Sequence, residues 1–591
     1  MEYVLDVADS LSNKKWVQRA EKIPYSERLI ETVIQKYELP EIIARAVIGR
    51  NISLEQIEPY LYPKLRQLLP DPLILKDMQK GISQLANVIM SGGKIGLFAD
   101  YDVDGATSAA LFINFLKKIN IETTLYIPDR IAEGYGPNIF GLKQLANDGA
   151  DLILTLDCGI SAFKVLNEAA GAGLSIIVID HHMAEVELPR ATAVINPNRI
   201  DDTSGLGFLA AVGVSFLFIV ALNRQLRQEG WYKDKVEPAL IQLLDLVALG
   251  TVCDVVPLTQ LNRAFVSQGL KVIASRGNVG LRVLSEVAKI DQKTDSYQLG
   301  FVLGPRINAG GRVGMADIGA RLLSTNDLSL AATLAKTLDA NNTVRKEIEA
   351  SVLKEAIEQA EVRIQDDDVI LVYGEKWHPG VIGIIAARLK EKFNKPACVV
   401  SFDGVTGKGS GRSIPKWDLG ASIIAGVQSN ILTVGGGHGM AAGFSIQRER
   451  IEEFRTFICS RFKLSSLNEA TSVELKLDGV LSVGGMDRNI INVLSLLEPY
   501  GSGNPEPIFA IPSVEITYSA IVGENHVRCN FRSPEGSTIK GIAFRSSDNA
   551  VGRTLMNHKG RRFNLAGKVK EDNWQGREGV QVIIEDVALA N

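Results

Sequence analysis

The chain has 591 residues, a net charge of -4, 46% hydrophobic residues and 22% charged residues. One hydrophobic core rarely extends beyond about 250 to 300 residues, so this length excludes a single-domain protein and predicts three or more domains. The composition is typical of a folded, soluble chain and excludes extensive disorder. The five cysteines form no CxxC pairs, which excludes a disulfide framework and a zinc cluster and favours a reducing cytoplasm.

The first part of the chain is expected to be helical. Pro63 and Pro70 interrupt its pattern near the boundary with the next region. Residues 1–16 include acidic side chains and lack the apolar run of a signal peptide, so secretion is not expected. We therefore assign residues 1–75 to an N-terminal helical region.

From Lys94 onward, short apolar runs alternate with amphipathic segments. The expected helices include residues 106–119 and 161–172, and the expected strands are 95–99, 124–127, 152–156, 175–179 and 193–195. Such alternation is typical of a doubly wound parallel sheet with helices on both faces. The sequence therefore predicts an α/β domain over residues 76–275.

Residues 206–222 form an uncharged segment that reaches the lower limit of about 17 residues for a membrane span. A crossing there would place acids that precede and follow the segment on opposite sides of a bilayer and would divide the candidate site described below. We therefore expect a buried helix in this segment and no membrane contact.

The second half of the chain is expected to contain a helical connection and two further domains. A charged, glycine-poor run from residue 328 to about 365 predicts a long helix within a connection over residues 276–365. Strand-like runs on either side of a loop and helix predict a second, smaller α/β domain over residues 366–464. A small β-barrel over residues 465–591 is predicted by strand-like runs at 473–477, 513–521, 526–531, 538–544, 562–569 and 580–587.

The predicted barrel contains a strongly basic segment. Between residues 528 and 570 there are two acids, Glu535 and Asp548, against ten basic residues, a local charge of about +8. The ten are Arg528, Arg532, Lys540, Arg545, Arg553, Lys559, Arg561, Arg562, Lys568 and Lys570. This charge indicates a surface for nucleic acid. Phe531, Phe544 and Phe563 are either stacking aromatics on that surface or residues of the core.

Acidic residues follow three of the predicted strands at the point where each strand ends. The strand at 95–99 runs into DYDVDG (100–105), which has three carboxylates in five residues. The strand at 152–156 ends in Asp157, and the strand at 175–179 ends in DHH (180–182). Because the carboxyl ends of parallel strands lie on one edge of a sheet, where open α/β folds bind ligands, these groups are expected to converge.

Asp254 is a fourth candidate, since it interrupts an apolar, helix-like run and a buried carboxylate requires a cation or a donor. Carboxylates with imidazole and no thiolate favour manganese or magnesium over structural zinc. A pair of such ions lowers the pKa of a bridging water and stabilises both oxygens in phosphate-ester cleavage. Taken singly, each acidic motif is also consistent with a solvated turn, and each histidine with a hydrogen-bonded core position.

Four motifs resemble those of the DHH phosphoesterases: DYDVDGATS (100–108), LDCGIS (156–161), VIDHH (178–182) and ALGTVCDVVPL (248–258). Further segments resemble the RecJ family in the same order: GPRIN (304–308), HPGVIG (378–383), GSGRS (409–413), GGGH (435–438) and LEPYGSGNPEP (497–507). The DHH triplet alone is a weak signal, but this ordered set covers most of the chain from about residue 15 and is highly specific. The resemblance also implies that the barrel is an OB-fold.

The resemblance implies which residues hold two ions of manganese or magnesium. The implied ligands are Asp102, Asp104, Asp157, His181 and Asp254, with Asp157 bridging the two ions. His182 matches the family's phosphate-contacting histidine, and Asp100 is either a further ligand or an acid that supports one. Some DHH phosphoesterases have a ligating histidine where this chain has Phe98, so the first ion is expected to have fewer protein ligands here.

Several residues outside the acidic cluster are expected to bind the substrate. Ser410 and Arg412 lie in a glycine-rich loop whose amides and guanidinium suit a phosphate, and three glycines precede His438. The resemblance places these residues in a DHH-associated domain that faces the metal ions. A solvated arginine and a plain turn are the alternatives for these two segments. The remaining candidates are Arg130 for a phosphate, Tyr135 for packing or stacking, and Arg306, Asn308 and Arg312 near the entrance.

The resemblance implies a 5′-to-3′ exonuclease on single-stranded DNA that releases 5′-mononucleotides and acts in DNA recombination and repair. An oligoribonuclease or small phosphatase of the same superfamily is an alternative, but such proteins resemble only the two catalytic domains. A non-catalytic replication scaffold is disfavoured because the acids and histidines are intact. The expected partners are single-stranded DNA, a single-strand-binding protein and a helicase, and the expected state is a cytoplasmic monomer.

Overall fold

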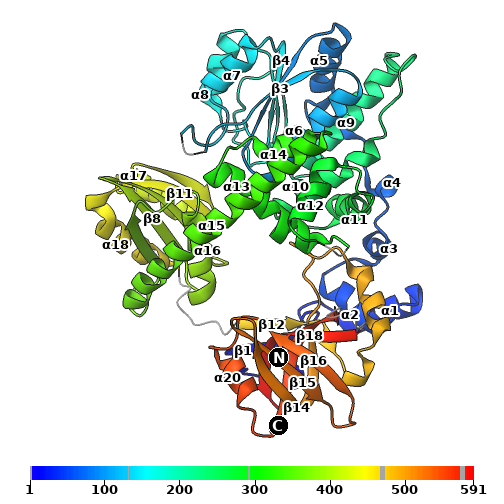
Figure 1. The fold of residues 1–591 in the computed structure, drawn as a ribbon, viewed down its shortest axis with the longest axis vertical. Coiled ribbons are helices and arrows are strands. Elements are labelled where there is room, and N and C mark those ends of the chain that lie inside the picture. The colour runs from blue at the N-terminus through cyan, green and yellow to red at the C-terminus, as the bar shows by residue number, and fades with distance from the viewer. Residues whose placement is uncertain (1–2, 131, 291–292, 466–472, 573–578, 591) are drawn as a thin grey trace. The chain divides into compact units, whose positions relative to one another are not determined.

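The computed structural model describes residues 3–130, 132–290, 293–465, 473–572 and 579–590 (Figure 1). The chain forms two compact units. The first unit comprises Met1–Pro70, Val255–Gln268 and Thr471–Asn591, and the second comprises Asp71–Asp254 and Gly269–Ala470.

The second unit contains a five-stranded sheet in which all neighbouring strands are parallel. The strand order is β3-β2-β4-β5-β6, with β2 (Ile95–Ala99), β3 (Thr123–Tyr126), β4 (Leu152–Leu156), β5 (Ile176–Ile179) and β6 (Ala193–Ile195). Every residue of β2, β4, β5 and β6 is buried, as expected for a parallel sheet covered on both faces. The predicted doubly wound parallel sheet is confirmed.

Helices cover both faces of this sheet (Figure 1). Phe98 of β2 packs with Leu142 and Leu166 in a core that joins the sheet to α7 (Ile139–Asn147) and α8 (Phe163–Gly171). On the opposite face lie α5 (Met78–Met90), α6 (Val103–Lys118) and α9 (Ala211–Gln228). The rings of Phe112 in α6 and Phe218 in α9 are 5.8 Å apart, so these two helices pack directly on each other.

The uncharged segment at residues 206–222 lies largely within α9, and most of its apolar side chains are buried in the second unit. This confirms the predicted buried helix. Among the described residues, no helix combines the length and the apolar character that crossing a bilayer requires.

A series of helices follows the parallel sheet along the chain. These are η4 (Leu240–Leu243), α10 (Leu244–Cys253), α11 (Gln260–Ala274), α12 (Val279–Val287), the π-helical η5 (Gln298–Leu303), α13 (Gly304–Val313), α14 (Ile318–Ser324) and α15 (Leu328–Arg363). The long helix α15 matches the prediction from residue 328 to about 365. It begins where the carboxylate of Asp327 accepts the backbone N–H groups of Ser329 and Leu330, as an N-cap does.

The second unit ends in a smaller α/β domain built on a five-stranded sheet of order β10-β11-β9-β8-β7. Its strands are β7 (Ile370–Glu375), β8 (Ala397–Asp403), β9 (Thr406–Arg412), β10 (Val434–His438) and β11 (Ala441–Gln447), and only β7 and β8 pair in parallel. The helices are α16 (Ile382–Phe393), α17 (Leu419–Gln428), η6 (Arg448–Arg450) and α18 (Ile451–Leu464).

The glycine-rich segments of this domain are strands. The prediction of a loop around Ser410 and Arg412 was therefore wrong. The alternative of a plain turn before His438 was also wrong. The glycines are needed because core side chains cover them. A Cβ on Gly409 would lie 2.3 Å from the Phe444 ring, and one on Gly411 would lie 2.7 Å from Leu419. Sequence propensity misses such strands because it expects β-branched residues.

The C-terminal part of the first unit is a closed barrel of order β13-β14-β15-β16-β18-β17, completed by the pairing of β14 with β17. The strands are β13 (Gly479–Val480), β14 (Phe509–Val522), β15 (His526–Arg532), β16 (Thr538–Ala543), β17 (Arg562–Asp572) and β18 (Gly579–Leu589). The connecting helices are η7 (Val483–Gly485), α19 (Arg488–Leu494), η8 (Ser495–Leu497) and α20 (Ala550–Met556). The predicted OB-type barrel is confirmed.

The N-terminal region packs with the barrel in the first unit. It contains η1 (Val4–Asp6), β1 (Lys14–Gln18), α1 (Ser26–Tyr37), α2 (Glu41–Gly49), η2 (Leu54–Gln56), α3 (Ile57–Leu61) and α4 (Leu65–Leu68). The next element, η3 (Pro72–Ile74), belongs to the second unit. The expectation of helices alone missed β1, whose hydrogen-bonding partner, β12 (Val473–Leu477), is distant in sequence. The indole N–H of Trp16 donates to the buried carboxylate of Asp586 at 2.9 Å, which ties β1 to the barrel.

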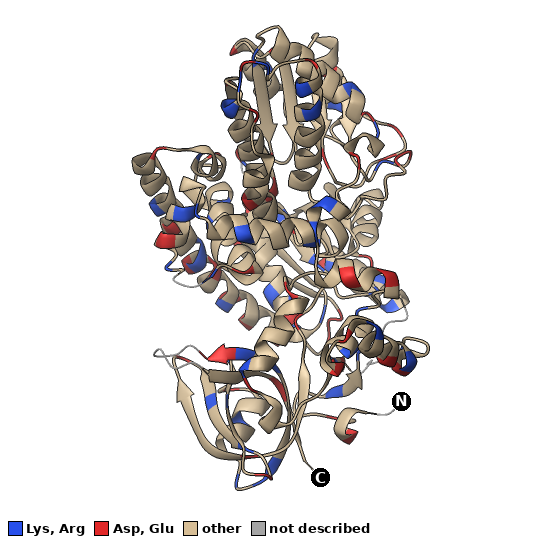
Figure 2. Cartoon of the chain, turned by 90° about the vertical axis from the view of Figure 1, so that its right-hand side faces the viewer, with Lys and Arg blue, Asp and Glu red and all other residues tan. Residues whose placement is uncertain are grey.

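The basic segment of the barrel is partly neutralised. Lys540, Lys568 and Lys570 form ion pairs with acids elsewhere in the first unit. Figure 2 shows basic and acidic positions interspersed on the barrel. Phe531 and Phe563 are fully buried core residues, whereas Phe544 is 53% exposed and is therefore the one of the three expected aromatics that a base can reach.

Candidate active site

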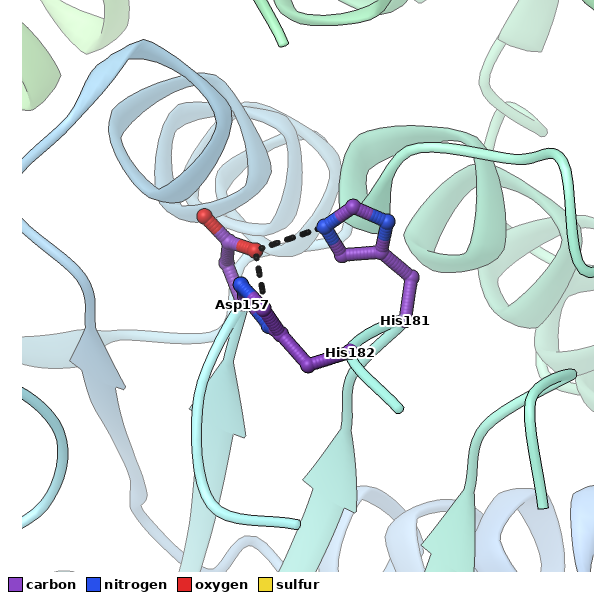
Figure 3. A group of neighbouring side chains, drawn as sticks. All are labelled: Asp157, His181 and His182. Carbon is purple, nitrogen blue, oxygen red and sulfur yellow. Dashed lines mark ion pairs between the residues drawn. The ribbon is translucent and has the colours of Figure 1, made fainter. Parts of the chain in front are cut away.

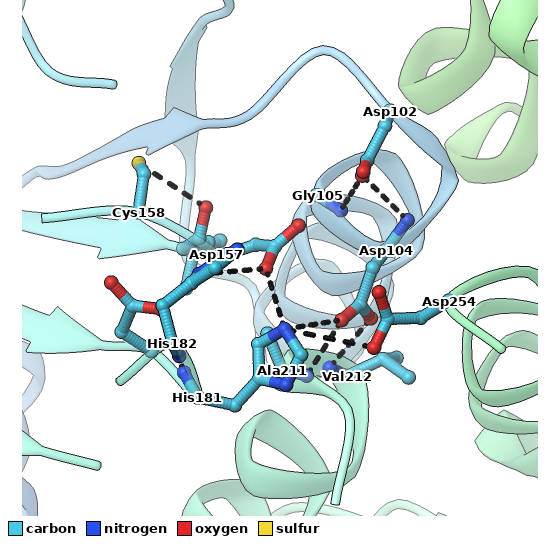
Figure 4. Close-up of polar contacts among 12 residues, drawn as sticks. Asp102, Asp104, Gly105, Asp157, Cys158, His181, His182, Ala211, Val212 and Asp254 are labelled. Carbon is cyan, nitrogen blue, oxygen red and sulfur yellow. Dashed lines mark hydrogen bonds and ion pairs between the residues drawn. The ribbon is translucent and has the colours of Figure 1, made fainter. Parts of the chain in front are cut away.

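The DYDVDG motif joins the end of β2 to the start of α6, and Asp102 is the N-cap of α6 (Figure 4). Its Oδ1 accepts the backbone N–H groups of Asp104 and Gly105 at 3.0 and 3.1 Å. A Cβ on Gly105 would lie 2.3 Å from the carbonyl oxygen of Asp100, so glycine is required for this close approach. The motif's alternating acids are thus fixed by a tight turn between strand and helix.

Asp104 is buried and receives two backbone hydrogen bonds from the start of α9. The N–H of Ala211 donates to Oδ2 at 2.6 Å and the N–H of Val212 donates to Oδ1 at 2.9 Å. The N-terminus of a helix favours a negative charge, so this contact stabilises the Asp104 carboxylate. It leaves the remaining lone pairs of Asp104 directed at its neighbours in the cluster.

His181 lies at the centre of the acids (Figure 4). Its Nδ1 is 3.0 Å from the carbonyl oxygen of Leu209, which can only accept a hydrogen bond, so Nδ1 carries the proton and Nε2 keeps its lone pair. Nε2 is 3.4 Å from Asp157, 3.6 Å from Asp254 and 3.8 Å from Asp104. A histidine whose second nitrogen donates to a backbone carbonyl is oriented as metal-binding histidines usually are.

Asp157 follows β4 and presents one oxygen to both histidines (Figure 3). Its Oδ1 is 3.4 Å from Nε2 of His181 and 3.9 Å from Nδ1 of His182. The backbone of Asp157 has φ of 60°, a left-handed conformation that aspartate tolerates better than most residues. The turn aims the carboxylate at the cluster instead of continuing the strand.

The carboxylates of this cluster are held close together in a buried site. Burial and the charge of Asp102 raise the pKa of Asp104 to about 7, and burial and the charge of Asp104 raise the pKa of Asp254 to about 9. The pKa of Asp157 is also raised well above its usual value, by burial and by Asp104. Burial and the charge of His182 lower the pKa of His181 to about 4. The arrangement favours bound cations.

His182 is held by Asp180, the acid of the DHH triplet, which was expected at the site but was given no role as a ligand or substrate contact. Burial would raise the pKa of Asp180, but the hydrogen bond and charge of His182 outweigh it and lower the pKa to about 2. Burial would lower the pKa of His182, but Asp180, 2.7 Å away, raises it to about 9. The hydroxyl of Tyr135 is 3.3 Å from Nε2 of His182, at the more exposed side of the cluster.

The residues present fit divalent metal ions. Buried oxygens of Asp100, Asp157 and Asp254, together with Nε2 of His181, have no hydrogen-bond partner among the described residues. The ligand atoms of Asp100, Asp102 and Asp157 lie within 4.8 Å of one another, as do those of Asp104, His181 and Asp254. Oxygen and imidazole donors without thiolate suit Mn²⁺ or Mg²⁺. Asp100 is therefore placed with the predicted ligands.

Phe98 is fully buried and stacks on Tyr126 with ring centroids 5.3 Å apart. It therefore belongs to the core beneath the site, at the position where some DHH phosphoesterases have a histidine.

Two backbone amides at the start of α9 bind Asp104, and the carbonyl of Leu209 binds His181. No side-chain motif in the sequence could reveal these backbone contacts.

Three of the predicted substrate-binding arginines lie near one another in the second unit. Burial and the positive charge of Arg130 lower the pKa of Arg312 to about 10 and also lower the pKa of Arg412. Arg312 donates to the carbonyl oxygen of Gly380 at 2.7 Å, which joins α13 to the smaller α/β domain. Three guanidinium groups with this mutual repulsion favour an anion between them.

Ser410 and Arg412 contact each other, with Nη1 of Arg412 donating to the Ser410 hydroxyl at 3.3 Å. A Cβ on Gly383 would lie 3.0 Å from that hydroxyl and 3.2 Å from Nη2 of Arg412, so the glycine of the HPGVIG segment leaves room for both. The guanidinium of Arg130 lies over the Tyr101 ring at 5.1 Å, and Tyr101 meets the Tyr135 ring edge-on.

The other predicted substrate-binding residues are not brought into these contacts. Arg306 forms an ion pair with Asp339 at 2.9 Å and donates to the carbonyl of Val302. Asn308 is half-buried on α13. His438 is exposed at the end of β10, and its Nδ1 accepts the N–H of Met440 at 3.4 Å.

Sequence reasoning also missed two asparagines that support the histidine pair. The side-chain amide of Asn196 donates to the carbonyl of His182 at 2.8 Å, and that of Asn198 donates to the carbonyl of His181. Asn196 follows β6 directly and Asn198 is the third residue after it, so the same strand-end pattern that revealed the acids applies to them.

Comparison with known proteins decides the family. The single-stranded-DNA-specific exonuclease RecJ of Dickeya dadantii is 35% identical over 570 residues, which are 93% of this chain and 96% of that protein. The chain belongs to the RecJ family. The Escherichia coli protein of the same description is 34% identical over 578 residues, covering 94% of this chain and 97% of the RecJ protein.

Models of three domains match separate parts of this RecJ-family chain: the DHH family N-terminal domain at residues 94–251, the DHHA1 domain at 366–464 and the RecJ OB domain at 477–586. The structure of RecJ in complex with Mn²⁺ from Thermus thermophilus is similar with a TM-score of 0.78 at 28% identity, covering 95% of this chain and 78% of that one. A second structure, of exonuclease RecJ bound to manganese, has a TM-score of 0.56 at 31% identity and covers 67% of this chain and 95% of that one.

Replacing Gly105 by alanine is expected to lower the nuclease rate by about a hundredfold, because the new Cβ displaces the turn that holds Asp102 and Asp104 and displacements of about 1 Å can cost that much. Gly171→Ala is the control, since a Cβ there meets no atom within 4 Å. Initial rates on single-stranded DNA measure the effect. Equal rates for the two variants would contradict the close approach at Gly105.

Mn²⁺ is expected to raise the melting temperature of the wild-type chain, since a ligand at a hundred times its Kd stabilises by about 2.7 kcal/mol. Asp157→Asn, which keeps the left-handed backbone accessible, is expected to abolish this dependence on Mn²⁺. Asp148→Asn, at an exposed position, should retain it. Thermal denaturation over a Mn²⁺ series tests this, and an unchanged Mn²⁺ response in Asp157→Asn would remove Asp157 from the metal centre.

Proposed function

We propose that this chain is a 5′-to-3′ exonuclease on single-stranded DNA that releases 5′-mononucleotides by two-metal hydrolysis and acts in DNA recombination and repair. The observation that carries the proposal is the convergence of Asp104, Asp157, His181 and Asp254. Buried ligand atoms of Asp157, His181 and Asp254 lack a hydrogen-bond partner among the described residues. Relatives along the whole chain are described as single-stranded-DNA-specific exonucleases, which supports the substrate.

When bound, the divalent ions supply a more acidic water and stabilise the attacking and leaving oxygens of the phosphodiester. The residues of the chain hold and orient the groups around this reaction. The carbonyl of Leu209 keeps the Nε2 lone pair of His181 directed at the acids, and Asp180 fixes the ring of His182 at the edge of the cluster. From there His182 is proposed to contact the scissile phosphate.

A metal site alone does not determine direction, because it hydrolyses a strand that enters from either end. We propose that Arg412, with Ser410 and Arg130, binds the terminal 5′-phosphate and thereby places the first linkage over the acidic cluster. Burial and, after it, the charge of Arg130 lower the pKa of Arg412, and the repulsion between the two guanidinium groups supports an anion at this point. Arg312 lies in the same group, whereas Arg306, Asn308 and His438 are proposed to contact the strand further along.

The barrel is proposed to hold the strand away from the cleavage site, through its basic residues and Phe544. Deletion of residues 465–591 would not test this role of the barrel alone, because it would remove the partners of Trp16 and β1 and expose their core. Single substitutions on the barrel surface avoid this damage.

The rival functions make different predictions. An oligoribonuclease or small phosphatase would not require the OB domain, which is present here at residues 477–586. A replication scaffold would not require the acids and the histidine to remain in one cluster. Partners remain proposals: a single-strand-binding protein, a helicase and a monomeric state. A cytoplasmic location is also a proposal, which the five free thiols support. The domain boundaries at residues 75, 275, 365 and 464 are proposals as well.

Digestion of a single strand labelled at one end or the other is the direct test of the function. With Mn²⁺, a 5′ label is expected to appear at once as a mononucleotide, while a 3′ label remains on strands that shorten gradually. Early release of the 3′ label would reverse the direction. Equal cleavage of RNA would favour the oligoribonuclease, and absence of cleavage would favour the scaffold.

Arg412→Ala is expected to lower kcat/KM on 5′-phosphorylated strands by about tenfold to a hundredfold, since a hydrogen bond to a charged group contributes about 1.5 to 3 kcal/mol. Strands with a 5′-hydroxyl should lose much less, because they lack the contacted group. Arg388→Ala, a half-exposed arginine on α16 of the same domain, is the control. Equal losses on both substrates would give Arg412 a structural role.

Phe544→Ala is expected to weaken binding of a long single strand by about fivefold to a hundredfold, because stacking of one base on an aromatic ring contributes about 1 to 3 kcal/mol. Phe140→Ala, which removes an exposed ring from the second unit, should leave affinity unchanged. Fluorescence anisotropy with a labelled strand measures the affinity of both variants, each combined with Asp157→Asn so that the strand is not cleaved. Unchanged affinity in Phe544→Ala would exclude the ring from the binding surface.

A further inference from the structure

A cavity of about 190 Å³ lies in the second unit, apart from the acidic cluster. It is lined by the end of α11, one face of α12, three residues beyond α12 (Ile290, Lys293 and Thr294) and the first turn of α10. Ile273, Leu281 and Ile290 form apolar walls, and Asp245, Arg282 and Lys293 add charged groups. None of these residues takes part in the proposed exonuclease site.

Asp245 is the buried polar group of this cavity, with 4% of its surface exposed. Its Oδ1 accepts the backbone N–H of Leu246 at 2.8 Å, and the structure gives its Oδ2 no hydrogen bond to any residue that it describes. Burial raises the pKa of Asp245 to about 6. Oδ2 is not among the fully buried oxygens that lack a partner, so it is open to the cavity, where a ligand that supplies N–H groups would donate to it.

The mouth of the cavity has the opposite charge. Arg282 is half-buried and Lys293 is exposed, and neither forms an ion pair with an acid among the described residues. A third basic residue, Arg276, is paired with Glu286. The rim therefore favours an anion and disfavours a cationic ligand, although the interior presents a carboxylate.

These features together select a flat ring with N–H donors at one edge and an anionic tail at the other. The volume exceeds the ~150 Å³ of a cavity that holds benzene, so it admits a larger ring while a tail remains outside. Guanine carries a ring N–H and an amino group side by side, which match the two oxygens of one carboxylate. Adenine, cytosine and uracil each present a hydrogen-bond acceptor at the corresponding edge.

We propose that this cavity binds a guanine nucleotide, with the base on Asp245 and the phosphates on Arg282 and Lys293. The site is separate from nuclease catalysis, but it shares an element with it. Asp245 lies in the first turn of α10, and Asp254 of the acidic cluster follows the last residue of the same helix.

Isothermal titration of the full chain with GDP, ADP, CDP and UDP in metal-free buffer tests the proposal, because binding of the phosphates at the arginine group of the second unit would not distinguish the four bases. GDP is expected to bind at least about tenfold more tightly than the other three, the effect of one lost hydrogen bond to a charge. Asp245→Asn should lose that preference and gain affinity for xanthosine diphosphate. Its amide donates to the xanthine oxygen that replaces the guanine amino group.

The exchange of specificity distinguishes recognition from damage, since a misfolded variant cannot gain a ligand. Arg282→Ala is the second variant and should weaken all four nucleotides by a similar factor without changing the order of the bases. Equal binding of the four bases, absence of GDP binding, or an unaltered preference in Asp245→Asn would overturn the proposal. Displacement of GDP by a thymidine strand with one terminal guanine would assign the site to the DNA strand, and lack of displacement to the free nucleotide.

Discussion

The acidic cluster of the second unit holds buried carboxylates close enough to repel one another. Asp100, Asp104, Asp157 and Asp254 stand within one cluster, and burial together with their mutual charge raises the pKa of each. Such an arrangement is stable only if cations or protons neutralise it. Backbone dipoles of α9 at Asp104 and the imidazole of His181 supply part of the compensation, and divalent ions supply the rest when bound.

The parallel sheet brings these carboxylates together at the ends of its strands. Three neighbouring parallel strands, β2, β4 and β5, each deliver part of the cluster at the same sheet edge, and α10 delivers Asp254 from outside the sheet. Supporting contacts then fix the orientation of each group: the N-cap at Asp102, the carbonyl at His181 and the carboxylate of Asp180 at His182. The site is thus held by buried parts of the fold, while most of the proposed substrate contacts come from α13 and the smaller domain.

The sequence predicts that these acids and His181 come together, because most of them lie just after a recognisable apolar strand or helix and parallel pairing brings strand ends together. Their role as metal ligands stays a prediction. The sequence predicts the glycine-rich strand β9 poorly because Gly409 and Gly411 are selected by the rings and side chains that cover them, which lie elsewhere in the chain. The same reason hides β1, whose partner β12 is distant in sequence. Contacts of backbone groups, such as Leu209 with His181, and the neighbourhood of Arg130 with Arg312 and Arg412, depend on tertiary structure and leave no local pattern.

We propose that the acidic cluster holds two metal ions and that Asp157 bridges them. Titration with Mn²⁺ followed by electron paramagnetic resonance counts the ions and reports their separation, since two ions about 3.5 to 4 Å apart, as in two-metal sites, give a spin-coupled spectrum. We expect two ions for each chain with a coupled signal, and loss of the coupling in Asp157→Asn. A single uncoupled ion in the wild-type chain, or a coupled pair that persists without the Asp157 carboxylate, would contradict this proposal.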